Sequence, residues 1–187
     1  MRLASRHAKM GSMDPLLALQ RLPRLAERAM RVAIACALTE GRMTPRAIVD
    51  RALVDFETSV ARLGAVRPAL LFAERDRIAR ELRAFVDGRL AGRLRGLRRS
   101  AVIAAGASAS PFDLVVRNRF ERIYAVVFRR LPRDGSRLAI LQRIRATLQT
   151  ATRTPIDGVL VYDFSLGKTV LLHQTGAQRM DRYLRAS

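Results

Sequence analysis

One aspartate in the second half of the chain occupies a position suited either to metal binding or to a structural role. Asp113 follows Pro111-Phe112 and precedes the apolar run Leu114-Val115-Val116, so we expect it at the entry of a β-strand. Carboxylate oxygens are ligands that Mg²⁺ prefers, so a chemical role for this residue depends on what the segments around it resemble. An aspartate at a strand entry also often bonds its own backbone. The residue alone leaves both interpretations open.

Arginine is the other residue type whose abundance points to chemistry. The chain has 35 Lys+Arg against 16 Asp+Glu, a net charge of +19, and its only lysines are Lys9 and Lys168. A guanidinium group binds phosphate through two parallel donors, so this charge favours DNA or RNA backbone as partner. A GC-rich genome would enrich arginine as well, and a solvated basic face is the structural alternative. The candidate contacts lie at the end of the predicted third helix and beside the predicted sheet: Arg93, Arg95, Arg98, Arg99, Arg129, Arg130, Arg133, Arg137 and Lys168.

Other chemistries have little support in the sequence. His7, His173 and the single Cys36 give no metal-ligand spacing and no internal disulfide, so we expect a reducing compartment, the cytoplasm. The segment 165–169 lacks the first glycine of a phosphate-binding loop and predicts a hairpin turn instead. No apolar run is long enough to span a membrane, and we expect a soluble protein. Aromatic residues make up 5% with no tryptophan, so contacts to backbone should dominate over base stacking.

The first half of the chain has helical periodicity. A capping residue precedes proline at Asp14-Pro15 and at Thr44-Pro45, and Pro68 opens a third helix that we expect to be long, with apolar positions continuing to Leu94. Pro23 predicts a break or kink in the first helix, dividing it into a short and a longer piece. Residues 1–13 are basic and predict a flexible arm, a transit peptide or an expression-tag remnant.

After Ser100 the apolar period changes from helix to strand. One further helix, from Ser136 to about Thr150, should connect two parallel neighbouring strands. The fold class is therefore α/β, more specifically α+β: a helical N-terminal half followed by an αβββαβ(β) core with a mixed sheet. We expect a helical region at 14–79 packed on a core at 80–187. The predicted strands are Ala101–Ala105, Phe112–Val116, Arg122–Phe128, Gly158–Tyr162 and Lys168–Leu172.

Four segments between about Arg80 and His173 resemble the PD-(D/E)xK nuclease superfamily, in its RecB-type branch. Residues 111–116 resemble the strand that carries the first aspartate, and residues 124–129 the strand with a hydrophobic-Glu-hydrophobic-Lys pattern. Residues 136–141 resemble the start of the following helix, and 158–170 the last pair of strands. The resemblance implies a restriction-endonuclease-like fold, with Asp113 as the first metal ligand.

The chain departs from the pattern of that superfamily at the residues that carry its chemistry. Val127 stands at the Glu position, Arg129 at the Lys position, Arg137 at the Gln position and Leu141 at the Tyr position. One carboxylate among guanidinium groups is a poor site for a hard cation, so the departures predict that cleavage is lost and no cofactor is bound. Arginine in place of acid and lysine would make a cleft that binds phosphate without cutting it.

Three functions follow from these observations. The leading one is a nuclease-like domain that binds nucleic-acid backbone through arginine, as a subunit of a larger complex. The second is an active Mg²⁺-dependent deoxyribonuclease, in which Asp113 is joined by Glu121, Asp134 or Glu81, with Lys168 or Arg129 as the cationic group. The third is an assembly protein that binds a protein partner through its N-terminal amphipathic helices.

Overall fold

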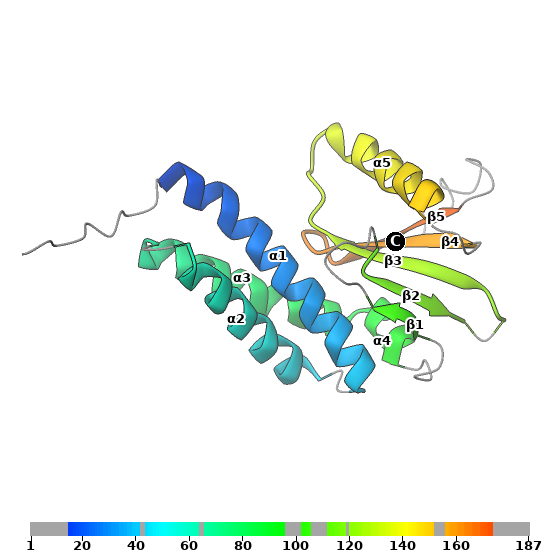
Figure 1. Cartoon of the computed structure of the whole chain (residues 1–187), viewed down its shortest axis with the longest axis horizontal. Helices are drawn as coiled ribbons and strands as arrows, with labels where there is room; N and C mark the ends of the chain where they lie inside the picture. Colours follow the sequence, from blue (N-terminus) through cyan, green and yellow to red (C-terminus); the bar gives the residue numbers. More distant parts are fainter. Residues whose placement is uncertain are drawn as a thin grey trace, which may run out of the picture.

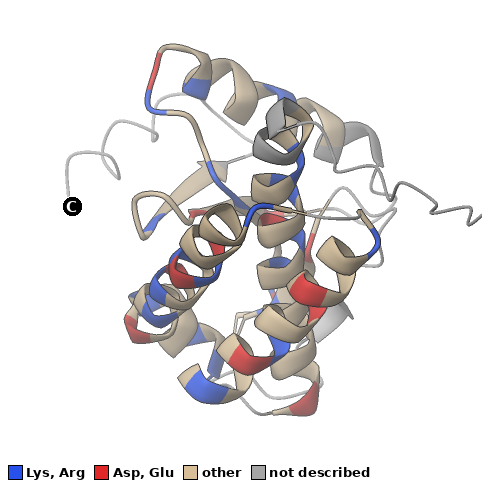
Figure 2. Ribbon diagram, turned by 90° about the vertical axis from the view of Figure 1, so that its left-hand side faces the viewer, with Lys and Arg blue, Asp and Glu red and all other residues tan. Residues whose placement is uncertain are grey.

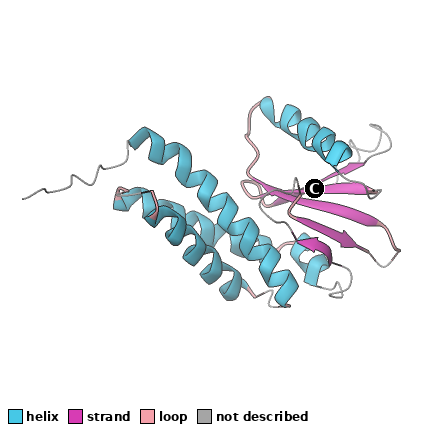
Figure 3. Cartoon of the chain, in the orientation of Figure 1, coloured by secondary structure: helices cyan, strands magenta, loops and turns pink. Residues whose placement is uncertain are grey.

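The computed structural model describes residues 15–41, 44–63, 66–95, 102–105, 112–118, 120–151 and 156–173. Helices fill the first half of the chain and a mixed sheet the second, so the fold is α+β, as the sequence predicts (Figure 3). The helices are α1 (Pro15–Glu40), α2 (Pro45–Ala61), α3 (Pro68–Asp87), α4 (Arg89–Arg95) and α5 (Ser136–Ala151). The strands are β1 (Val102–Ala105), β2 (Leu114–Arg117), β3 (Ile123–Arg129), β4 (Gly158–Asp163) and β5 (Lys168–His173).

The first helix is continuous, and the expected break at Pro23 is wrong. α1 runs through Pro23, although proline has no amide hydrogen for the helical ladder. Buried apolar side chains on both sides of Pro23, such as Leu22 and Ala26, stabilise the helix by packing and outweigh this local cost. Gly41 ends α1 with a φ of 70°, and its amide donates to the carbonyl of Leu38.

The expected long third helix is two helices. α3 ends at Gly88, whose φ of −79° and ψ of 160° are extended, and α4 begins at the next residue. Apolar periodicity continued through this point, so the break was missed; glycine suits the position because a Cβ there would lie only 3.1 Å from the Phe85 carbonyl oxygen and 3.2 Å from that of Ala84. The start of α2 is as predicted, because the Thr44 hydroxyl accepts from the Ala47 amide at 3.3 Å.

The sheet has strand order β1-β2-β3-β4-β5. β1, β2 and β3 pair antiparallel, β3 and β4 pair parallel, and β4 and β5 pair antiparallel. α5 provides the connection between the parallel neighbours β3 and β4, which confirms the prediction from the sequence. Leu114 stands opposite Val126, and Val127 opposite Val161, so β3 lies at the centre of the sheet.

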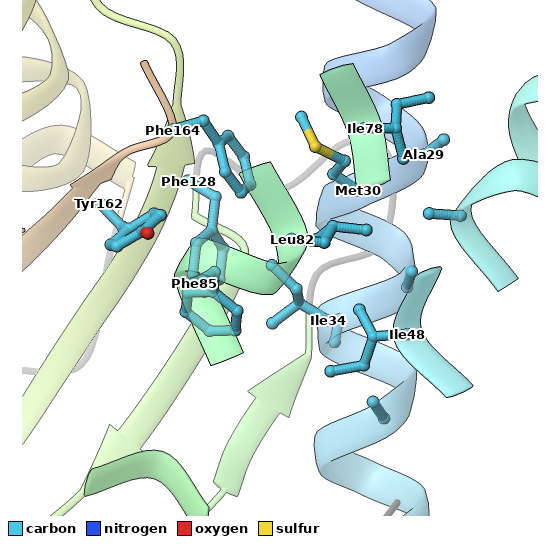
Figure 4. Packing of buried hydrophobic residues seen from close by; sticks show 14 of the residues in the cluster. Ala29, Met30, Ile34, Ile48, Ile78, Leu82, Phe85, Phe128, Tyr162 and Phe164 are labelled. Carbon is cyan, nitrogen blue, oxygen red and sulfur yellow. The ribbon is translucent and has the colours of Figure 1, made fainter. Parts of the chain in front are cut away.

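Helices lie on both faces of the sheet (Figure 1), and apolar side chains pack against each face. Against one face lies α5, whose Leu141 packs with Val127 and Val161. The helices of the first half lie against the other face. One cluster of buried side chains joins these helices to the sheet, and it runs from α1 and α2 through Leu82 and Phe85 to Phe128, Tyr162 and Phe164 (Figure 4). The cluster crosses the expected boundary between residues 79 and 80, so the helical region and the sheet share one core.

Candidate functional site

Asp113 lies buried between the helical half and the sheet. Its side chain accepts from the backbone amide of Phe128 at 2.7 Å, which fixes the carboxylate beside the end of β3. Arg31 of α1 approaches Oδ1 at 2.5 Å through Nη2, and Arg129 of β3 approaches Oδ2 at 3.3 Å through Nη1. The carboxylate therefore bonds the backbone of a neighbouring strand rather than its own, and two guanidinium groups neutralise it.

The same junction holds three glutamates and two more arginines. Glu27 of α1 accepts from the Arg130 amide at 3.0 Å, and Arg130 donates through Nε to Glu81 at 2.9 Å. Arg130 also lies 3.8 Å from Glu74, which pairs with Arg77 one turn along α3. We call the whole set the junction network: Glu27, Arg31, Glu74, Arg77, Glu81, Asp113, Arg129 and Arg130.

The junction network is electrically balanced, with four carboxylates and four guanidinium groups. Burial lowers the pKa of Arg129, the Asp113 carboxylate opposes that shift, and the neighbouring Arg31 adds to it. Arginine nonetheless stays charged at neutral pH, so the network consists of ion pairs. Such pairs hold elements together, and they leave little net charge for an external phosphate.

A second buried carboxylate organises the turn after β3. Asp163, fully buried at the end of β4, accepts from the Leu131 amide at 3.2 Å and from the Ser165 hydroxyl at 2.6 Å. Arg137 of α5 completes the site with a 2.7 Å bond from Nη1. Arg137 thereby connects α5 to the sheet.

The predicted phosphate contacts fall into three groups. Arg129, Arg130 and Arg137 have internal carboxylate partners, so the geometry gives them a structural role and argues against a phosphate-binding cleft at these positions. Their ion-pair partners include carboxylates of α1, α3 and β4, and the spacing of residues in the sequence does not predict these pairs. The remaining candidates are exposed or outside the described residues. Arg93, Arg133 and Lys168 are exposed, Arg95 donates to the Val86 carbonyl at 3.0 Å, and Arg98 and Arg99 lie outside the described residues.

The residues at this junction do not fit a divalent metal. Both oxygens of Asp113 are occupied by guanidinium groups, and Val127 is fully buried in the α5-side core rather than beside Asp113. Glu81 pairs with Arg130, while Glu121 and Asp134 are exposed turn residues that bond to Arg117 and Ser136. Across the described part of the chain, no group of three or more His, Cys, Asp or Glu side chains is placed to hold a metal ion.

One set of basic residues was missed from the sequence. Arg21, Arg24 and Arg28 are exposed on α1, at spacings of three and four residues that place them on one side of the helix. The spacing itself was the available signal, but the expected break at Pro23 divided the stripe between two helices. We call these three residues the α1 arginine stripe.

Comparison of the chain with protein-family models, curated proteins and solved structures finds no match. None of the described helices is long and apolar enough to cross a membrane.

Proposed function

We propose that this protein binds the phosphate backbone of nucleic acid and does not cleave it. The observation that carries the proposal is the division of its arginines into two populations. One population pairs with carboxylates, either in the junction network or in other ion pairs such as Arg46–Asp50 and Arg137–Asp163, and the other is exposed without a carboxylate partner in the described residues. The exposed population supplies the excess positive charge that attracts a polyanion.

The resemblance to PD-(D/E)xK nucleases supports descent from a fold that binds nucleic acid, but it does not support cleavage. The order α-β-β-β-α-β of the second half agrees with the order that the resemblance implies, and Asp113 stands at the entry of the second strand of that core. Arg31 and Arg129 occupy its oxygens, so a metal-activated water has no place to form. A nuclease-like fold without its metal site is suited to a subunit that binds nucleic acid. The single cysteine, Cys36, is free, which fits a reducing compartment such as the cytoplasm.

The test is binding of labelled duplex and single-stranded DNA and RNA at several salt concentrations, with and without Mg²⁺ or Mn²⁺. We expect affinity to fall steeply with salt, at a slope of about −0.9 per phosphate contact on duplex DNA, because each contact releases counterions. The products run on a denaturing gel should remain intact in either metal.

Two outcomes would overturn the proposal. Metal-dependent cleavage that is lost in Asp113→Ala would restore the nuclease. Absence of binding at low salt would leave the assembly function, for which the exposed apolar residues Val54 and Phe72 on α2 and α3 would then be the first surface to test.

A further inference from the structure

The exposed side of α1 carries no acid between Leu17 and Val32, and the exposed Glu40 lies at the far end of the helix, where it pairs with Arg51. The exposed positions from Leu17 to Val32 include Arg21, Arg24 and Arg28. The one acid in this stretch, Glu27, is 21% exposed and is turned towards the sheet, where it bonds the Arg130 amide. No carboxylate of the described residues lies within ion-pair distance of the α1 arginine stripe.

The other two long helices of the first half carry mixed charge. On α2, Arg46 pairs with Asp50, and the exposed Glu57 pairs with Arg75 of α3. On α3, acidic and basic residues share the exposed side: Asp76, Arg80, Arg83 and Asp87. Figure 2 shows such acidic and basic positions interleaved on the same helices. A surface of both signs attracts a polyanion less than a surface of one sign, so the stripe is distinguished by the absence of acid and not by arginine alone.

The stripe is held by a rigid support. Opposite it, α1 buries Leu22, Ala26 and Met30 in the shared core. One turn beyond Arg28, Arg31 is fixed by Asp113. From Arg21 to Arg28 the helix advances about 10 Å, at roughly 1.5 Å per residue, which fixes the spacing of the three Cα atoms along one side of the helix. The backbone from which the three side chains extend therefore needs no rearrangement on binding.

From this arrangement we infer that the α1 arginine stripe binds the phosphodiester backbone of a nucleic-acid duplex. The inference rests on the proposed function and names its surface and its partner. A duplex is favoured over a single strand because binding of unpaired bases uses exposed aromatic side chains, and α1 presents none. Among the described residues the large exposed aromatics are Phe72 on α3 and Phe120 in the turn between β2 and β3. An anionic membrane is disfavoured, since the apolar side of α1 is already buried in the core.

The experiment compares two triple variants of the full chain that remove the same charge. The test variant is Arg21→Gln, Arg24→Gln and Arg28→Gln. The control variant is Arg62→Gln, Arg80→Gln and Arg83→Gln, which removes three exposed arginines, one directly after α2 and two on the mixed-charge side of α3. Glutamine keeps helix propensity, and none of the six side chains has a carboxylate partner in the described residues. Circular dichroism and the thermal midpoint should therefore match wild type in both variants.

Binding to DNA and RNA duplexes is then measured over a salt series. We expect the test variant to reduce the slope of log K against log salt by about 2.7 on duplex DNA, three contacts at about 0.9 each, and the control variant to change it by less than about 1. The DNA and RNA arms decide which duplex is preferred, since the phosphodiester chemistry is shared.

The outcomes separate this inference from the proposed function. Wild type that binds no nucleic acid would overturn both. Wild type that binds, with equal losses in the two variants, would overturn the inference alone and show that charge acts without a defined surface. A test variant that loses binding to anionic vesicles but keeps duplex binding would also overturn it, as would tighter binding of single strands than of duplexes.

Discussion

At the scale of single residues, Tyr162 is the side chain with an unusual environment. Its ring is packed against Phe85, Phe128 and Phe164, with centroid distances of 5.0, 6.2 and 5.5 Å. Its hydroxyl is buried, with no hydrogen-bond partner in the described part of the chain. Burial, together with the negative charges of Glu81 and Asp163, raises the pKa of Tyr162 to about 12.

Tyr162→Phe should stabilise the protein. Removing a buried hydroxyl that lacks a partner should raise the free energy of unfolding by about 1 kcal/mol at neutral pH. The hydroxyl is hydrogen-bonded to water in the unfolded state and has no hydrogen bond in the folded state, so its removal destabilises only the unfolded state. The pKa of Tyr162 is higher in the folded state than in the unfolded state. The protonated tyrosine therefore contributes its full stabilisation below a pH of about 10, and this stabilisation is lost as the pH rises towards about 12. The advantage of the variant over wild type should therefore grow at alkaline pH.

Urea unfolding of both proteins at neutral pH and near pH 11 measures this difference. Tyr124→Phe removes a phenol from β3 and serves as the control for loss of one tyrosine. An advantage for Tyr162→Phe that stays constant or shrinks between the two pH values would contradict the prediction.

At the scale of elements, helix and strand positions followed from local signals. Thr44-Pro45 marked the start of a helix correctly, and apolar runs marked all five strands. The two errors, at Pro23 and Gly88, are both at residues that weaken a helix. Buried side chains flank both residues, yet α1 continues through Pro23 and the chain breaks at Gly88. Local propensity indicates the weak points of a helix, and it does not predict which of them break.

Gly167 is a turn position where the backbone requires glycine. It has a φ of 64° in the turn between β4 and β5, and its amide donates to the Asp163 carbonyl at 2.8 Å. Gly167→Ala should destabilise the protein by about 1 to 2 kcal/mol, because a Cβ atom is strained in the left-handed region. A clash adds little, since the nearest atom to such a Cβ is the Tyr162 hydroxyl at 3.8 Å.

Gly135→Ala provides the matched control for this turn. Gly135 has no positive φ, and a Cβ there meets no atom within 4 Å, so the substitution should change stability by less than about 0.5 kcal/mol. Chemical denaturation of both variants gives the comparison. Equal effects would show that the conformation of Gly167 is not what makes glycine necessary.

At the scale of the whole molecule, the junction network joins the helical half to the sheet. Arg31 and Asp113 are 82 residues apart, and Glu81 and Arg130 are 49 apart. No spacing rule predicts pairs so distant, which is why the sequence indicated phosphate contacts where the structure has ion pairs. Residue type and strand position were available from the sequence for Asp113, but its partners were not.

Asp113→Asn should lower the free energy of unfolding by weakening the contact between the helical half and the sheet. The substitution leaves the partly buried Arg31 and Arg129 without their carboxylate, and breaking a buried pair from one side costs about 3 kcal/mol or more. Asp50→Asn breaks a pair whose side chains are 93% and 66% exposed, and it should cost less than about 1 kcal/mol. Urea unfolding curves for the two variants measure both effects, and a loss from Asp113→Asn as small as that from Asp50→Asn would contradict a structural role for the network.

The aromatic cluster around Tyr162 makes the docking of the two halves visible in an optical experiment. The chain has no tryptophan and only three tyrosines. Of these, Tyr162 is held in a fixed, asymmetric environment between Phe85 of the helical half and Phe128 of the sheet. The part of the near-ultraviolet dichroism that Tyr162→Phe removes therefore reports the contact between the halves, while far-ultraviolet dichroism reports the helices themselves. The protein carries an intrinsic chromophore at the interface that defines its fold.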